Sequence, residues 1–263
     1  MKNKIARWSI RIITLSILFI STLILIVFNP NLLYAKKTEV GNFIVFHQSN
    51  LDPELPSRLQ AVDELIQSSE LYDPRFKVKI CLNDGSMYPV LFEKLRGPAF
   101  GWGFYNIATF RGTFDYSKNK VVLNGYAWNM EQLIAHEVTH CLQANALGMM
   151  SANPFGNHAQ WKWEGYPEYV ARRNAEQTSL MKNIKRIKET REKNPGAWGI
   201  FFNDGTVAPG TYYDHWLLVQ YCLDIEGMTY SDLLKSDISR GTLEKKMLDW
   251  YQNQAENNDA RGR

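Results

Sequence analysis

The stretch His136–His140, with sequence HEVTH, constrains the fold most. Its two histidines lie on the same face, where they can bind one metal ion, if the segment is an α-helix. Residues four apart lie on the same face of an α-helix, about 6 Å from one another. Both imidazoles can then reach one tetrahedral Zn²⁺, and Glu137 lies close enough to act as a general base on a metal-bound water. Asn129 is a candidate N-cap for this helix. The alternative is an ordinary amphipathic helix with two hydrogen-bonded histidines.

A catalytic zinc ion bound by two histidines needs a third protein ligand and an open position for water. Glu164 and Glu168 follow in the aromatic-rich segment 161–169, and on a helix they too share a face. One carboxylate can bind the metal, while the other accepts the free N–H of a ligating histidine and fixes its tautomer. The alternative is a solvated helix face, against which the neighbouring Trp and Tyr residues argue.

HExxH followed some two dozen residues later by W-x-x-E-G-x-x-E-Y resembles the gluzincin metallopeptidases, which are thermolysin-like in the broad sense. The resemblance is closest to the compact bacterial peptidase MA-like group. It implies that Glu164 is the third zinc ligand and that Glu168 supports His136. Pro167 stands between the two glutamates, and proline is tolerated in the first turn of a helix. We therefore expect that helix to begin near Glu164.

The resemblance also implies an α+β fold, namely a zincin-like two-lobed metallopeptidase domain. An N-terminal mixed β-sheet with helices would precede a mainly helical C-terminal lobe. In the family, an edge strand about thirty residues before HExxH lies over the metal and pairs with the substrate backbone. This position falls on Tyr105, Asn106, Ile107 and Ala108.

A peptide-hydrolysing zinc site also needs a donor to stabilise the oxyanion. Relatives carry a tyrosine at the start of a later helix, and Tyr212 matches that position best. His215, three residues on along the same helical face, is the second candidate, and Tyr213 is a reserve. The alternative is an aromatic packing cluster.

Periodicity predicts a mixed first half and a mainly helical second half. Expected strands are 43–48, 76–82, 103–110 and 120–123, the last two as a β-pair. Expected helices are 58–69, the HExxH helix, the helix with Glu168, an exposed basic helix over 182–193, 214–225 and 242–254. Segments 148–160 and 194–211, rich in Gly, Pro and Asn, are expected loops.

The N-terminus carries a membrane segment. Residues 12–28 are apolar apart from four Ser and Thr, which is longer than the usual core of a signal peptide and near the lower limit for a spanning helix. The predicted organisation is a cytoplasmic basic segment 1–11, a transmembrane signal-anchor 12–28, a linker 29–40, the metallopeptidase domain 41–254 and a polar tail 255–263. More positive charge before the span than after it predicts a domain outside the cytoplasm. The alternative is secretion after signal cleavage near Ala35.

Charge excludes one class of partner. The chain carries a formal charge of +3, but residues 1–37 hold six basic residues and no acidic one. Beyond residue 37, 24 basic residues stand against 27 acidic ones, so the domain has no basic footprint for nucleic acid. Cys81, Cys141 and Cys222 have no CxxC spacing and are expected as small buried residues. A disulfide such as Cys81–Cys222 is left open.

These patterns predict a membrane-anchored, zinc-dependent metallopeptidase that cleaves peptide or protein substrates with a zinc-bound water activated by Glu137. The alternatives are a catalytically silent zincin-like binding or scaffold protein, a zinc hydrolase of a non-peptide amide, and an interaction protein without metal.

Overall fold

The larger sheet contains five strands, and its last strand lies against the helix that carries HEVTH. A computed structural model describes residues 2–173 and 177–261. The strand order is β1-β2-β3-β5-β4, with β2, β3 and β5 parallel and the two outer pairings antiparallel. The bounds are β1 (Lys36–Val40), β2 (Phe43–His47), β3 (Val78–Cys81), β4 (Gly101–Phe104) and β5 (Ile107–Phe110).

The prediction of one strand over 103–110, paired with 120–123, is wrong. Tyr105 adopts a φ of 55°, and the chain turns there, so the segment forms the β4–β5 hairpin. Residues 120–123 belong to a separate three-stranded sheet of β6 (Thr113–Asp115), β7 (Lys120–Leu123) and β8 (Tyr126–Asn129). The expected loop 194–211 contains a two-stranded sheet, β9 (Gly199–Phe201) and β10 (Val207–Pro209).

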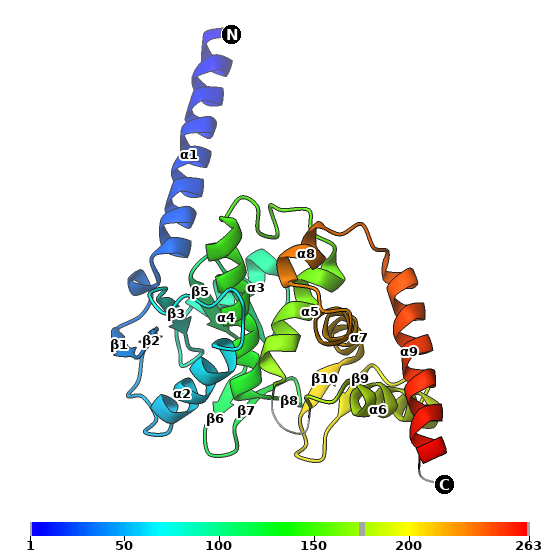
Figure 1. The fold of residues 1–263 in the computed structure, drawn as a ribbon. Coiled ribbons are helices and arrows are strands. Elements are labelled where there is room, and N and C mark those ends of the chain that lie inside the picture. Colours follow the sequence, from blue (N-terminus) through cyan, green and yellow to red (C-terminus); the bar gives the residue numbers. More distant parts are fainter. Residues whose placement is uncertain (1, 174–176, 262–263) are drawn as a thin grey trace.

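Helix α4 (Met130–Leu147) runs through the middle of the domain (Figure 1). Asn129 caps it as predicted, because its side chain accepts a hydrogen bond from the backbone N–H of Gln132 at 3.0 Å. The helix is buried from Met130 to Ala144 except at Glu131, since it packs against β4 and β5 on one side and against α2 and α5 on others. Burying histidines and a glutamate on such a helix costs free energy unless their polar atoms have hydrogen-bonding or ionic partners.

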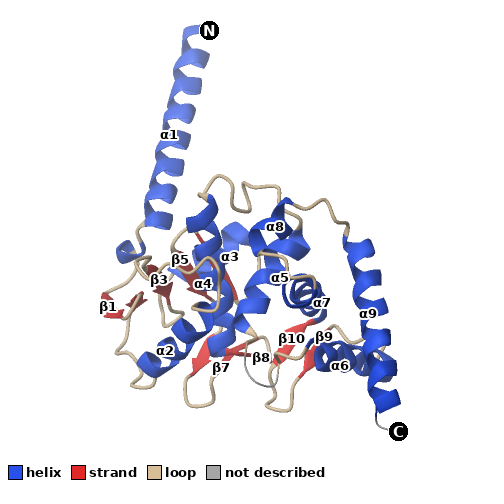
Figure 2. Cartoon of the chain, in the orientation of Figure 1, coloured by secondary structure: helices blue, strands red, loops and turns tan. Residues whose placement is uncertain are grey.

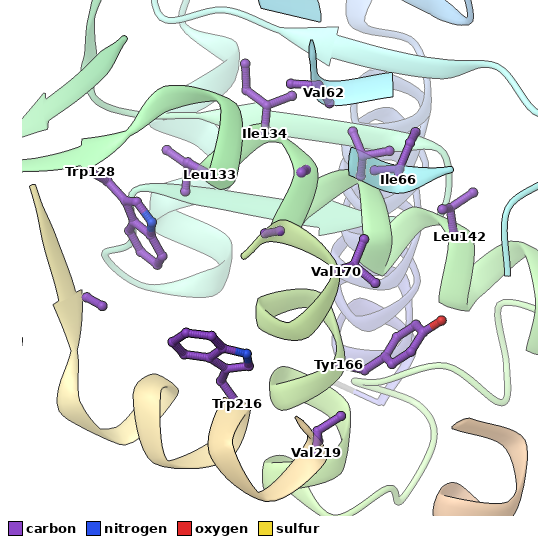
Figure 3. Close-up of a cluster of buried hydrophobic side chains, with 14 of the residues drawn as sticks. Val62, Ile66, Trp128, Leu133, Ile134, Leu142, Tyr166, Val170, Trp216 and Val219 are labelled. Carbon is purple, nitrogen blue, oxygen red and sulfur yellow. The ribbon is translucent and has the colours of Figure 1, made fainter. Parts of the chain in front are cut away.

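The remaining helices surround α4, and Figure 2 shows them mostly on the side away from the larger sheet. Except for α3, which packs in a separate apolar cluster, their apolar faces form one core with α4 that includes Leu133, Tyr166 and Trp216 (Figure 3). The bounds are α2 (Leu55–Ile66), α3 (Tyr88–Arg96), α5 (Gln160–Ala171), α6 (Leu180–Lys193), α7 (Gly210–Gln220), a π-helical turn (Tyr221–Ile225), α8 (Tyr230–Lys235) and α9 (Arg240–Arg261). The α+β class is confirmed, and the zincin-like two-lobed arrangement stays a prediction.

Helix α5 begins at Gln160 and contains Pro167 in its interior, so the expectation that it begins near Glu164 is wrong. The loop before it ends at Ala159, whose extended backbone starts the helix one turn earlier. At the other end of the chain, α9 runs well beyond the expected limit at residue 254. Residues 262–263 of the expected polar tail lie outside the described residues.

Helix α1 (Lys2–Phe28) leaves the domain as a single rod (Figure 1). Its segment Trp8–Phe28 is long and apolar enough to cross a membrane, a property shared by membrane anchors and signal sequences. A short 3₁₀ turn (Pro30–Leu32) joins it to β1. Met1 of the expected cytoplasmic segment lies outside the described residues.

Candidate metal centre

Three side chains from α4 and α5 converge at the surface of α4 that faces β4. His136, His140 and Glu164 each offer one ligand atom, and these atoms all lie within 4.8 Å of one another. Oε2 of Glu164 is 3.2 Å from Nε2 of His140 and 3.6 Å from Nε2 of His136. Both histidines are buried, and Glu164 is half-buried. This group can hold a metal ion.

The tautomer of His140 follows from its neighbours. Nδ1 of His140 lies 2.7 Å from Oε1 of Gln143, whose amide nitrogen donates to the carbonyl oxygen of Trp163 at 3.0 Å. A carbonyl can only accept, so this contact fixes which end of the amide is nitrogen and which is oxygen. Nδ1 of His140 therefore carries the proton, and the lone pair of Nε2 points toward Glu164.

Pro167 explains why the Trp163 carbonyl is available to Gln143. In an α-helix the carbonyl of residue 163 accepts from the N–H of residue 167, and proline has no N–H. The amide of Gln143, from the neighbouring helix, takes the place of that donor. Its second N–H bonds the hydroxyl of Tyr230 at 2.6 Å, so the fully buried Gln143 uses all its hydrogen-bonding groups.

His136 is held by an ionic pair instead. Its Nδ1 lies 3.1 Å from Oε1 of Glu168, and Oε2 of Glu168 accepts from Nε of Arg172 at 2.5 Å. Both Glu168 and Arg172 are almost completely buried. Arg172 also donates to Gln132 at 3.0 Å and lies over the ring of Trp216 at 5.5 Å. The Glu168 carboxylate faces Nδ1 of His136, so Nε2 of His136 also faces Glu164.

The site therefore brings three side chains with electron-pair donors together, and a metal ion between them would be attracted to all three. Metal bonds of about 2.0–2.1 Å at tetrahedral angles place adjacent ligand atoms about 3.3 Å apart. The two distances from Glu164, 3.2 Å and 3.6 Å, bracket that value. Two imidazoles and one carboxylate also form the ligand set of catalytic zinc sites that keep one open position. The residues fit a zinc ion.

The pKa values of the ligand side chains also favour a positive charge at the centre of the group. Burial raises the pKa of Glu164, but electrostatic attraction to His140 and His136 outweighs this effect and holds the pKa well below its usual range. Burial lowers the pKa of His136, but hydrogen bonds to Glu164 and Glu168 outweigh it and raise the pKa to about 10. Without a metal, a proton on His136 supplies the positive charge, which a metal ion would displace.

Glu137 lies beside this group under strand β4. Burial raises the pKa of its carboxyl, and the opposing attraction of the two histidines does not offset the effect. A β-carbon at Gly103 would overlap the carbonyl oxygen of Glu137, and one at Gly101 would lie 2.9 Å from its Cγ. Only glycine permits so close an approach of β4 to α4. The strand thus forms a wall directly beside the candidate base.

A cleft of about 550 Å³ opens over the three ligands and Glu137. β4 lines one wall, and the rest of the lining includes Trp163, residues of the 148–160 loop and Tyr212. The ring centroid of Tyr212 lies 5.9 Å from that of His136, and burial raises the pKa of its hydroxyl. Tyr212 can therefore serve as an uncharged hydrogen-bond donor inside the cleft.

The structure separates the other two candidates from the cleft. His215 is buried and does not line the cleft; its ring lies 6.3 Å from that of Tyr212, and burial lowers its pKa. The hydroxyl of Tyr213 faces Asn183 and Arg186 instead. Of the three residues considered from the sequence, Tyr212 alone lines the cleft.

The strand predicted to bind substrate is also displaced. Tyr105 and Asn106 form the turn of the hairpin, and Ile107 and Ala108 belong to β5, which lies between β3 and β4. The edge strand is β4, and in the described part of the chain no strand pairs with its outer side. The prediction of 105–108 as an edge strand is wrong because Tyr105 takes a positive φ that no local sequence signal indicates.

Sequence reasoning missed Gln143 and Arg172. Both have a helical signal that could have found them, since Gln143 lies three residues after His140 and Arg172 four after Glu168. The cysteines are as expected, since all three are buried free thiols. No family model matches the chain, and no curated protein matches its sequence.

Proposed function

We propose that this protein is a zinc-dependent metallopeptidase of the gluzincin type, with Glu137 as its general base. The observation that carries the proposal is the convergence of three electron-pair donors beside a buried glutamate, under a strand with a free edge. His136, His140 and Glu164 would hold the ion. When bound, zinc supplies Lewis acidity that polarises a carbonyl and acidifies water.

Glu137 has the environment that a general base for this reaction needs. Burial raises the pKa of Glu137, and a higher pKa makes its carboxylate a stronger base toward the proton of water, which it would then return to the leaving amine. Tyr212, neutral and half-buried at the side of the cleft, would donate a hydrogen bond to the oxyanion. His215 would act only by packing behind Tyr212.

Strand β4 would bind the substrate backbone. The backbone N–H of Arg111 donates to Phe100 O at 2.9 Å, so the Phe100–Arg111 pair is hydrogen-bonded across the hairpin. In an antiparallel pair such positions alternate, so Gly101 and Gly103 direct their main-chain groups away from β5. An extended peptide lying in the cleft can pair with these groups as an added strand.

We also propose that α1 stays attached as a single-pass anchor, with the domain outside the cytoplasm. Residues around the alternative cleavage point are part of the folded domain. Tyr34 is buried and its hydroxyl donates to Leu82 O at 2.7 Å, while Leu33 O accepts from Gln48 and Ser86. Cleavage after Ala35 would remove these contacts.

The test uses the full chain, purified in detergent, with zinc measured by elemental analysis and hydrolysis measured on a mixed-sequence peptide library. We expect one zinc per chain and cleavage in the parent protein. Glu137→Gln should keep zinc and lose cleavage, because it removes the proton acceptor and leaves the three ligands. Glu164→Gln should lose or weaken zinc binding.

Each result discriminates among the possible functions. Zinc binding without cleavage of any library member would indicate the silent scaffold or a hydrolase of non-peptide amides. Unchanged cleavage in Glu137→Gln would refute the assigned mechanism. A parent protein that binds no zinc after loading and desalting would remove the enzyme hypothesis altogether.

A further inference from the structure

We propose that one rim of the cleft rests on the outer surface of the bilayer that holds α1, so that the site acts on polypeptides held at that surface. This inference rests on the proposed peptidase function and names its substrate class. Three observations carry it: the attachment of α1 to the cleft wall, an uncharged apolar rim beside that attachment, and the short path from this rim to the metal ligands.

The end of α1 is fixed to the hairpin that forms the cleft wall. The ring of Phe28, the last residue of the apolar segment, lies 5.8 Å from that of Phe104 and 6.0 Å from that of Tyr105. The carbonyl oxygens of Val27 and Phe28 accept hydrogen bonds from Tyr88 at 2.5 Å and from Lys79 at 3.1 Å. The domain is thus held in one orientation relative to the helix.

The apolar surface continues from α1 across the rim of the cleft. Phe104 lies 6.4 Å from Phe155, which belongs to the loop between α4 and α5. In Figure 1 this loop lies on the side of the domain from which α1 leaves. The residues Tyr105, Met150 and Phe155 are 42%, 69% and 56% exposed. We call Phe104, Tyr105, Met150 and Phe155 the apolar rim.

The loop that carries Met150 and Phe155 of the apolar rim has no charged residue that would oppose contact with a membrane. Residues 148–160 contain no Asp, Glu, Lys or Arg, so their burial in a lipid interface carries no cost for removing a charge from water. Aromatic side chains favour the interface between lipid and water, where they bury apolar surface. A bilayer that surrounds α1 up to Phe28 lies immediately beside these side chains. The occupant of this surface is therefore the membrane itself.

The apolar rim lies very close to the metal-ligand residues. Phe104 follows Gly103, which lies directly against His140. A β-carbon at position 103 would be only 2.6 Å from Cβ of His140. Phe155 lies between Pro154 and Gly156, both of which line the cleft. A peptide bound at the ligands therefore lies next to the membrane surface. The preferred substrate is a polypeptide anchored in, or adsorbed to, the same bilayer.

Contact with lipid can be measured without any enzymatic reaction. The full chain with Phe155→Cys, labelled with an environment-sensitive fluorophore, is placed in phosphatidylcholine nanodiscs with or without brominated acyl chains. The three native cysteines are buried, so the label reacts at residue 155. The matched control is Phe201→Cys, since Phe201 is similarly exposed at 59% but lies on β9, far from α1 in Figure 1.

We expect a blue-shifted emission and quenching by brominated lipid at position 155, and neither effect at position 201. Equal, weak quenching at both positions would overturn the inference. Because this readout does not involve catalysis, it separates the membrane contact from the proposed peptidase activity. Quenching at 155 in a protein that cleaves no peptide would keep the contact and refute the substrate class.

The substrate class is tested with one mixed-sequence peptide library, either free in solution or coupled to a lipid in the same nanodisc. We expect the lipid-coupled library to be cleaved about tenfold faster or more, because both partners share one surface at a high effective concentration. Phe155→Ser should lower the ratio of coupled to free cleavage, and Phe201→Ser should leave it unchanged. An equal ratio in both variants would show that the rim does not direct the substrate.

Discussion

The surroundings of the two candidate ligand histidines differ in charge. Behind His136 lies a buried ionic pair, Glu168 with Arg172. Behind His140 lies a neutral amide, Gln143, held by a carbonyl and a hydroxyl. Both arrangements place the proton on Nδ1, so both direct Nε2 to the same point. The difference shows that orientation of an imidazole needs only a correctly fixed acceptor, whereas a carboxylate also makes the imidazole a stronger donor to a metal.

The largest expected effect comes from Glu168→Gln, which makes the surroundings of His136 neutral like those of His140. A carboxylate accepts from His136 and Arg172 at once, but an amide has one oxygen and cannot serve both. We expect zinc affinity to fall about 10–100-fold. Because Arg172 loses its buried partner, the free energy of unfolding should also fall by about 3–5 kcal/mol. Chelator competition and denaturant titration of the full chain measure the two effects.

The double variant Glu168→Gln/Arg172→Met is the control that separates these effects. It removes the unpaired buried charge, so we expect most of the lost stability to return. Zinc affinity should stay low, because His136 still lacks its carboxylate. If the double variant recovered zinc affinity as well, the ionic pair would have only a structural role and the comparison between the two histidines would fail.

Second in size is Gln143→Met, which removes the neutral arrangement behind His140 at similar volume. The variant leaves the Nδ1–H of His140 and the carbonyl of Trp163 without their partner. Loss of such buried hydrogen bonds costs about 1–3 kcal/mol of stability, and the ring becomes free to rotate. We expect zinc affinity to fall less than in Glu168→Gln. An equal or larger fall would mean that orientation, rather than charge, dominates metal binding.

The two regions also differ in how well the sequence predicts them. The capped helix α4 and the pairing of residues on one face, His136 with His140 and Glu164 with Glu168, follow from helical spacing, because those relations are local to each helix. The division of roles between the two glutamates rests on the family resemblance. The arrangement behind His140 does not, since Gln143 depends on a carbonyl that Pro167 frees on another helix. A proline inside a helix predicts a break from sequence alone, but here a tertiary hydrogen bond compensates for the missing N–H.

The cleft wall was predicted poorly for a related reason. The edge strand could be expected about thirty residues before HEVTH, but its register depends on the turn at Tyr105, which takes a φ that is uncommon for tyrosine. The glycines of β4 read as weak strand residues in sequence. Their role becomes clear only from the contact of β4 with α4, where Gly101 and Gly103 leave room for Glu137.

The smallest expected effect is that of Tyr230→Phe, which tests how much of the neutral arrangement is needed. The hydroxyl of Tyr230 takes one of the two N–H groups of Gln143, and its ring stacks on Tyr166 at 3.7 Å between centroids. Phenylalanine keeps the stacking and leaves a single buried N–H unpaired, so we expect a loss of about 1 kcal/mol in unfolding free energy. Zinc affinity should remain close to the parent value, because the Trp163 carbonyl still fixes the amide and therefore the tautomer of His140. A fall in affinity as large as that of Gln143→Met would show that Tyr230, rather than the carbonyl freed by Pro167, holds the amide in place.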